Sequence, residues 1–271
     1  MPALDAILVH SNIKTSPPLK FERVNVLGVS VGVLTHHRLT ALLRECLDSG
    51  LKGWLSYVNV HALNLAATHP WFQLFLNKSL VTYCDGQGVR FGAFLQGNSI
   101  PERIVMSDWI YDVCETAVLR QLRVFFLGST ETVVNQASSS FKILYPELLI
   151  AGVHHGYLSD IDSEAVVHLI NKATPDILVV GMGMPLQEEW ILKYIDRLDV
   201  RIVCNAGSCF DYVAGVKKRC PTWMGVMGFE WLYRLVQEPR RLWQRYLIGN
   251  PLFVWRIIRN TFQLKFFVHL F

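Results

Sequence analysis

The chain has 271 residues, which is enough for one large domain or for one domain with an appendage. Apolar residues make up 51% and charged residues 18%, so the composition allows a large core and excludes a globally disordered chain. The net charge of +4 is concentrated at the C-terminal end, where residues 217–271 hold ten Lys or Arg and two acids.

The first residues show no basic segment followed by a long apolar one, so we expect no signal peptide. The prolines and small polar residues of 1–22 predict a loose N-terminal arm. The six cysteines form no C-x-x-C pair, which favours reduced thiols in the cytoplasm over a disulfide framework.

Short apolar runs rich in β-branched and aromatic residues then recur, and most are separated by stretches of helical length. This alternation predicts an α/β fold, Rossmann-like, with a mostly parallel sheet and helices on both faces, over residues 23–215. We expect Ser107 to be the N-cap of one helix. The predicted strands are 24–31, 54–60, 80–84, 123–128, 148–153, 176–183 and 201–207, and the clearest helices are 107–120, 159–173 and 185–198.

The pattern changes in the last part of the chain. Residues 216–271 predict a helical C-terminal appendage, broken near Pro239 and Pro251. It is basic and carries Trp223, Trp243 and Trp255. Such a composition suits an anionic membrane surface or a nucleic acid. No uncharged apolar run approaches the roughly 20 residues that a spanning helix needs, so we expect the appendage to lie on a membrane without crossing it.

One turn places a carboxylate where chemistry is common in open α/β folds. Asp85 and Gly86 follow the apolar run 80–84 in "VTYCDGQGVRFG". Ligands of such folds bind outside the carboxyl ends of the strands. An Asp that only caps a turn is the plainer interpretation, because Asp and Gly are ordinary turn residues.

Two strand–glycine–helix turns offer an anion site. "FFLGSTETV" contains Gly128, and "VVGMGMPLQEEW" contains Gly181 and Gly183. Backbone N–H groups at a helix start favour anions such as diphosphate, although glycines that merely shape a loop explain the turns equally well. Neither turn matches a dinucleotide fingerprint or a P-loop.

Arginines of the appendage are the sharper signal for phosphate. Arg234, Arg240, Arg241 and Arg245 lie close together among Trp and Tyr residues. A guanidinium binds two phosphate oxygens at once, whereas the alternative is a solvated basic face. The sequence has no D-x-D near a strand end and no His/Cys ligand set, so we expect neither a metal nor another cofactor.

Eight segments in one order resemble the WecG/TagA/CpsF family of bacterial glycosyltransferases, from about residue 24 to 250. Any one segment is weak, but the ordered set is specific, above all the last. They are "VNVHALNLA", "CDGQGVRFG", "PERIVMSD", "FFLGS", "HHGYL", "PDILVVGMGMPLQEEW", "NAGSCFDYVAG" and "GFEWLYRLVQEPRRLWQRY".

The resemblance implies an inverting, metal-independent enzyme that moves a sugar from a UDP-sugar to a polyprenyl-diphosphate-linked acceptor at the cytoplasmic membrane face. It implies that Asp85 is the base and that Asn59 lies in the same pocket, where we also expect Gly86 to bind substrate. Gln187 and Glu188 would lie at the nucleotide-sugar site with the glycines of the two turns. The appendage arginines Arg234, Arg241 and Arg245 would close over the diphosphate.

Three residues depart from the family pattern: Tyr57, Met106 and Leu186 stand where Thr, Gly and Lys are usual. They affect the expected sugar contacts, and N-acetylmannosamine, its uronic acid and glucose all stay open as the transferred sugar. We expect self-association in solution to cover apolar surface of the appendage, and no nucleic-acid partner.

Two other classes of protein remain as alternatives. A nucleotide-dependent oxidoreductase would use the same sheet, but it should show a complete dinucleotide fingerprint. A non-catalytic adaptor for membranes or nucleic acids would explain the appendage alone, and it would need neither the Asp85 turn nor the "PLQEEW" segment.

Overall fold

The computed structural model describes residues 19–268, with side chains up to residue 261. Six strands form one parallel sheet in the order β4-β3-β8-β7-β5-β6. They are β3 (Gly53–Val58), β4 (Val81–Cys84), β5 (Arg123–Gly128), β6 (Leu149–His154), β7 (Ile177–Gly181) and β8 (Ile202–Asn205). The predicted parallel sheet is confirmed.

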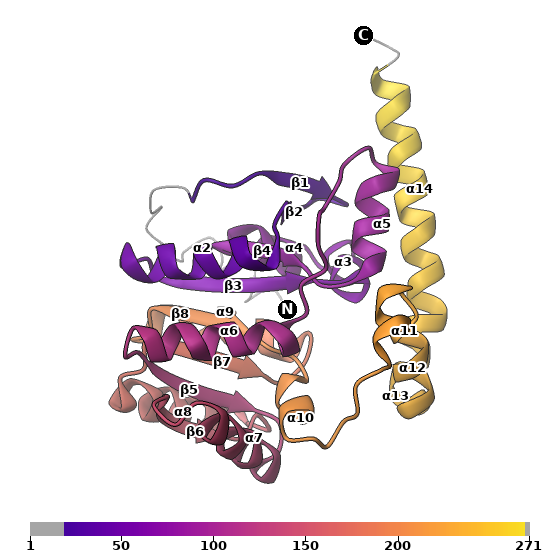
Figure 1. The fold of residues 1–271 in the computed structure, drawn as a ribbon. Helices are drawn as coiled ribbons and strands as arrows, with labels where there is room; N and C mark the ends of the chain where they lie inside the picture. Colours follow the sequence, from indigo (N-terminus) through magenta and orange to yellow (C-terminus); the bar gives the residue numbers. More distant parts are fainter. Residues whose placement is uncertain (1–18, 269–271) are drawn as a thin grey trace.

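Helices cover both faces of the sheet, as predicted (Figure 1). Successive side chains of a strand point to opposite faces, so Phe125 packs with one set of helices and Phe126 with the other. One set comprises α2 (His36–Asp48), α6 (Met106–Leu119), α7 (Glu131–Leu144) and α10 (Cys209–Val213). The other comprises α3 (Val60–Ala66), α4 (Pro70–Lys78), α5 (Gln87–Leu95), α8 (Asp160–Ala173) and α9 (Leu186–Tyr194), which the short η1 (Ile195–Arg197) follows.

The first predicted strand is wrong in its form. Residues 24–31 do not make a strand of the main sheet, but most of an antiparallel hairpin of β1 (Arg23–Val26) and β2 (Val29–Gly32). Leu27 and Gly28 turn the chain with φ angles of 51° and 85°, and the Gly28 N–H donates to Asn25 Oδ1. Two consecutive positive φ angles are the signature of a tight hairpin turn.

Ser107 is not the N-cap of α6, which corrects a second expectation. The helix begins one residue earlier, its N-cap is Val105, and no side chain caps it. By contrast, Ser159 caps α8 through a reciprocal pair of hydrogen bonds with Asp162, because an acid three residues after a cap serine can return the bond.

The C-terminal part is helical, as predicted, and stands along one side of the molecule (Figure 1). Pro239 begins a new helix, but Pro251 lies within the last helix and does not end it. The irregularity lies just before the last helix, where the chain forms a short π-helical stretch. The elements are α11 (Thr222–Val226), α12 (Glu230–Gln237), α13 (Pro239–Trp243), the π-helix η2 (Gln244–Ile248) and α14 (Gly249–Val268).

The appendage packs tightly on the rest of the molecule. Phe253 and Ile257 of α14 belong to the same buried cluster as Ala62 of α3. A Cβ on Gly92 of α5 would lie 2.8 Å from the Phe253 ring, so this glycine permits the close approach of the two helices. The division into an arm at 1–22, a body at 23–215 and an appendage at 216–271 stays a prediction, and most of the arm lies outside the described residues.

Candidate functional site: a cavity between sheet and appendage

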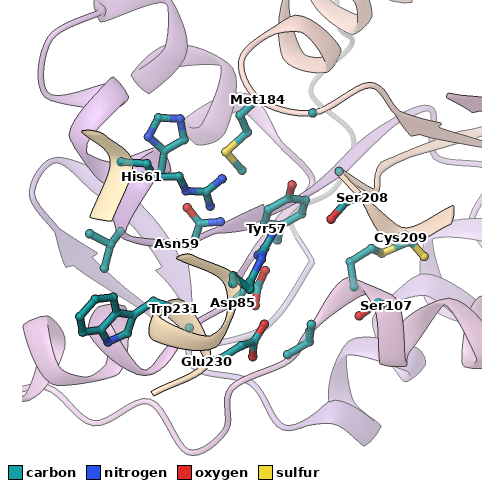
Figure 2. Close-up of a pocket in the computed structure, with 18 of the residues that line it drawn as sticks. Tyr57, Asn59, His61, Asp85, Ser107, Met184, Ser208, Cys209, Glu230 and Trp231 are labelled. Atoms are coloured by element: carbon teal, nitrogen blue, oxygen red, sulfur yellow. The ribbon is translucent and has the colours of Figure 1, made fainter. Parts of the chain in front are cut away.

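A cavity of about 600 Å³ lies where the carboxyl ends of the strands meet the appendage. Loops after β3, β4, β5, β7 and β8 form one wall, and residues of α12, α13, η2 and α14 form the other. Figure 2 shows Asn59, Asp85 and Glu230 gathered around one part of it. In open α/β sheets this edge is the usual place for a ligand.

Polar contacts hold the appendage over the cavity. Arg103 of the loop before α6 forms an ion pair with Glu230 of α12 at 2.8 Å. Lys217 bridges Asp211 of α10 and Glu238, at 2.7 Å and 3.2 Å. Because Arg103, Glu230, Lys217 and Glu238 all line the cavity, its shape depends on the docked position of the appendage.

Asp85 lies at the floor of this cavity, directly after β4. Its N–H donates to the carbonyl of Val58 on the neighbouring strand at 2.8 Å, which fixes the backbone. Within the part of the chain whose side chains are described, no group donates a hydrogen bond to its carboxylate. Burial, followed by the charge of Glu230, raises the pKa of Asp85 to about 7 against the opposing charges of Arg103, Arg234 and Arg245.

Asn59 is held rigidly beside Asp85. It is the N-cap of α3, and its Oδ1 accepts a hydrogen bond from the Ala62 N–H at 3.0 Å. Gly86 has a φ of 138°, and a Cβ there would lie 3.8 Å from Asn59. Asn59, Asp85 and Gly86 all line the cavity, so the structure brings together the three residues that the resemblance placed in one pocket.

The glycines of the two turns have different surroundings. Gly181 and Gly183 line the cavity, and Ser129 lines it beside Gly128. Gly128 is paired with Gly181 across β5 and β7. A Cβ on Gly128 would lie 2.3 Å from the Gly181 carbonyl oxygen. The main role of this glycine is therefore to let the two strands pack closely.

Gln187 and Glu188 lie beneath the cavity wall, with no solvent exposure. Gln187 Oε1 accepts hydrogen bonds from the N–H groups of Gly183 and Gly207, at 3.2 Å and 2.9 Å. Glu188 Oε1 accepts from Gln187 and Asn205, and burial raises the pKa of Glu188 to about 7. The pair therefore fixes two cavity loops from below, and its contact with a nucleotide sugar stays a prediction.

The three predicted arginines reach the cavity in different states. The Nε atoms of Arg234 and Arg245 are buried without a hydrogen-bond partner. Burial lowers the pKa of Arg245, the charge of Arg234 adds to this shift, and the charge of Asp85 opposes it. Arg241 is more exposed and pairs with Glu238. Two guanidinium groups that line one cavity, each with an unpaired Nε, suit a polyanionic ligand.

Several lining residues were not predicted as site residues from the sequence. Arg103 and Glu230 lie inside two of the quoted segments, "PERIVMSD" and "GFEWLYRL", which is the signal that could have identified them. Asp211 holds the turn before the basic segment, because its Oδ1 accepts from Ser129 Oγ at 2.7 Å and its other oxygen pairs with Lys217.

The three residues that depart from the family pattern also border the cavity. The Tyr57 hydroxyl accepts a hydrogen bond from Gln187 at 3.3 Å. A Cβ on Gly207 would lie 2.5 Å from the same hydroxyl oxygen. Met106 is buried, and its sulfur accepts from the Tyr83 hydroxyl. Leu186 is 60% exposed.

Among the described residues, no three His, Cys, Asp or Glu side chains come together as a metal site would require. In the same part of the chain, no helix combines the length and apolar character of a membrane span. The appendage nevertheless exposes large apolar side chains, including Trp223, Val226, Met227, Val236, Trp255 and Ile258.

Comparison with known proteins gives one consistent result. Residues 24–266 match the model of the "Glycosyl transferase WecG/TagA/CpsF family". Proteins of Staphylococcus aureus strains MW2 and NCTC 8325 are each 30% identical over 245 residues, which is 90% of this chain and 95% of theirs. Both are named N-acetylglucosaminyldiphosphoundecaprenol N-acetyl-beta-D-mannosaminyltransferase.

Proposed function

Since the chain belongs to the WecG/TagA/CpsF family of glycosyltransferases, we propose that it transfers N-acetylmannosamine from UDP to N-acetylglucosaminyl-diphosphoundecaprenol. Family membership confirms the resemblance seen in the sequence and decides against the oxidoreductase and the adaptor. The choice of sugar and acceptor rests on the names of the relatives. The observation that supports the chemistry is the unpartnered Asp85 carboxylate, which shares a cavity with Arg234 and Arg245, whose Nε atoms have no hydrogen-bond partner.

Asp85 is the general base of the proposed reaction. Its carboxylate accepts the proton of the acceptor hydroxyl, while that oxygen forms a bond to the anomeric carbon of the donor sugar. The bond from this carbon to the diphosphate oxygen breaks, and its electron pair leaves with UDP. Attack from the side opposite the leaving group inverts the configuration. A base with a pKa near the working pH is favourable for such a step, and Asp85 meets this condition.

Arg234, Arg241 and Arg245 stabilise the departing diphosphate. Charge develops on its oxygens as the bond breaks, and fixed cations in a dehydrated cavity stabilise that charge more strongly than cations in water do. Arg234 and Arg245 have no competing partner at Nε, whereas Arg241 would exchange Glu238 for phosphate. Asn59 lies beside Asp85 and orients the acceptor hydroxyl.

The appendage also brings the protein to its lipid-linked acceptor. Its exposed aromatic and aliphatic side chains would enter the headgroup boundary, and its basic residues would meet anionic lipid on the cytoplasmic face. Away from a membrane, self-association would cover the same apolar surface.

The decisive experiment offers purified protein UDP-N-acetylmannosamine, its uronic acid form and UDP-glucose, each with the prenyl-diphosphate-linked N-acetylglucosamine acceptor. We expect a lipid-linked disaccharide with an inverted linkage from the first donor only. Transfer from another donor alone would overturn the choice of sugar. Release of UDP without any disaccharide would overturn the proposed transfer.

A further inference from the structure

Glu230 is a second carboxylate in the cavity, and the proposed reaction gives it no role. It is the first residue of α12, so it belongs to the appendage, whereas Asp85 belongs to the body. Both side chains line the same part of the cavity (Figure 2), and the charge of Glu230 acts on Asp85. An acid in the first turn of a helix is commonly explained by the helix dipole. That explanation does not require the acid to face another carboxylate in a cavity.

The position of Glu230 is fixed from the body. Arg103 Nη1 lies 2.8 Å from Glu230 Oε2, and the two side chains are 21% and 27% exposed. An ion pair this sheltered holds its partners more firmly than a surface pair does. Docking of α12 therefore delivers a negative charge to a defined place beside Asp85.

We propose that Glu230 acts with Asp85 as a carboxylate pair across the boundary between body and appendage, so that docking of α12 completes the proton-accepting site. The proposal rests on the proposed function, in which Asp85 is the base. Glu230 is a positioning residue: it does not receive the proton itself, and it changes how strongly Asp85 holds one.

The electrostatic reason follows from the neighbours of Asp85. Burial raises the pKa of Asp85 first, and Glu230 is the next contribution in the same direction. Arg103, Arg234 and Arg245 act in the opposite direction. A carboxylate that must share its surroundings with another takes up a proton more readily. Without a docked appendage, Asp85 would lose both its dry surroundings and its like-charged neighbour, and it would become a weak base.

All titratable groups near Asp85 must be considered in a pH experiment. The phenols of Tyr57 and Tyr83 and the thiol of Cys84 stay protonated, because burial raises the pKa of each. Burial, together with the charge of Arg245, lowers the pKa of His61 to about 4, so that its ring is neutral at higher pH. Glu188 also has a raised pKa, and burial is the main cause of that shift.

The test compares kcat/KM as a function of pH for UDP-N-acetylmannosamine in four full-length proteins: wild type, Glu230→Gln, Arg103→Gln and Glu238→Gln. The acidic limb of the wild-type profile should lie near pH 7. In Glu230→Gln it should move to lower pH by about one unit, the scale on which one nearby charge acts in a dry site. In Arg103→Gln it should move to higher pH, because a cation that opposes protonation of Asp85 is lost.

Glu238→Gln is the matched control. Glu238 is also an appendage carboxylate that lines the cavity, and its partner Lys217 in turn pairs with Asp211 of the body. Glu230, by contrast, is among the main contributions to the raised pKa of Asp85. The removal of Glu238 should leave the limb in place. If the limb of Glu230→Gln stays at the wild-type position, or if that of Glu238→Gln moves equally, the proposal is wrong. Glu230 then only holds the appendage in place through its ion pair with Arg103.

A second measurement is independent of turnover. The carboxyl carbon of Asp85 can be titrated by NMR in wild type and in Glu230→Gln, both with intact chains. A lower midpoint in the variant supports the pair, and an equal midpoint overturns it. Failure of the proposed function gives a different result, namely a wild-type protein that transfers no sugar at any pH.

Discussion

Gly128 and Gly181 are paired so closely across β5 and β7 that a Cβ on Gly128 would lie 2.3 Å from the Gly181 carbonyl oxygen. Gly128 also has a φ of 156°. Replacing it by Ala should destabilise the fold by about 3 kcal/mol, the upper end of typical overpacking costs. Urea denaturation of both proteins measures the difference.

Gly97→Ala is the control for this substitution. Gly97 has a φ of 81°, yet a Cβ there would meet nothing within 4 Å. Only the backbone penalty of about 1 kcal/mol should remain. Equal losses in the two variants would mean that the close approach of Gly128 and Gly181 is unimportant for stability.

Asp85→Asn should keep the fold and UDP binding but lose at least about a hundredfold in kcat, because an amide cannot accept the proton and a general base contributes typically 10²–10⁴-fold. Turnover of UDP-N-acetylmannosamine and the Kd for UDP test the two halves of this prediction. A folded variant with wild-type turnover would place the base elsewhere.

The same variant should be more stable than wild type at pH 8. The pKa of Asp85 is raised in the folded state from its ordinary value of 3.8 to about 7. Protonated Asp85 therefore contributes stability that is fully present below about pH 4 and is lost as the pH rises through 7. The gain in stability from Asp85→Asn should therefore shrink as the pH falls from 8 towards 4. Thermal unfolding at several pH values measures it, and a gain that grows towards acid would contradict the raised pKa.

Much of the fold could be predicted because buried parallel strands and amphipathic helices leave clear periodicities. The hairpin of β1 and β2 could not be separated from a single strand, since Leu27 continues the apolar run and only Gly28 marks the turn. Ser107 is a favourable cap residue, but the helix begins before it, at Met106, which is itself buried. Tertiary contacts outweigh local preference in such cases.

The site was harder to predict for a physical reason. A turn at a strand end has a characteristic sequence, which predicted that Asp85 lies at the edge of the sheet, but its role as the base came from the resemblance and stays a prediction. Acids at the start of α9 suggest a solvated helix end, yet Glu188 is fully buried among amide donors. Arg103 lies in a loop without periodicity, and its relation to Glu230 spans 127 positions of the chain. Only the folded chain brings these charges together.

Transfer should continue in the presence of EDTA, because the appendage arginines can neutralise the leaving diphosphate. The measurement is the rate of UDP release on the lipid-linked acceptor, with and without chelator and with Mg²⁺ or Mn²⁺ restored. A reaction that stops with EDTA and recovers only with added metal would contradict this prediction.

Trp223→Ser combined with Trp255→Ser should reduce pelleting with anionic liposomes several-fold. Both indoles belong to the appendage and are 60% and 54% exposed, and each contributes buried apolar area at a headgroup boundary. Ile143→Ser with Leu144→Ser, on the exposed end of α7, is the matched control and should pellet like wild type. Arg241→Gln should also pellet normally while transferring sugar poorly. Unchanged pelleting of the double Trp variant would argue against anchoring by the appendage.

The single amide oxygen of Gln187 accepts from Gly183 in one loop and from Gly207 in another. These loops follow neighbouring strands and form adjoining parts of the cavity wall. In protein engineering, the two loops should therefore be treated as a single unit. A graft that replaces only one loop to admit a different sugar would break the shared bond and displace the other loop as well. A successful redesign must exchange both loops together with the glutamine that joins them.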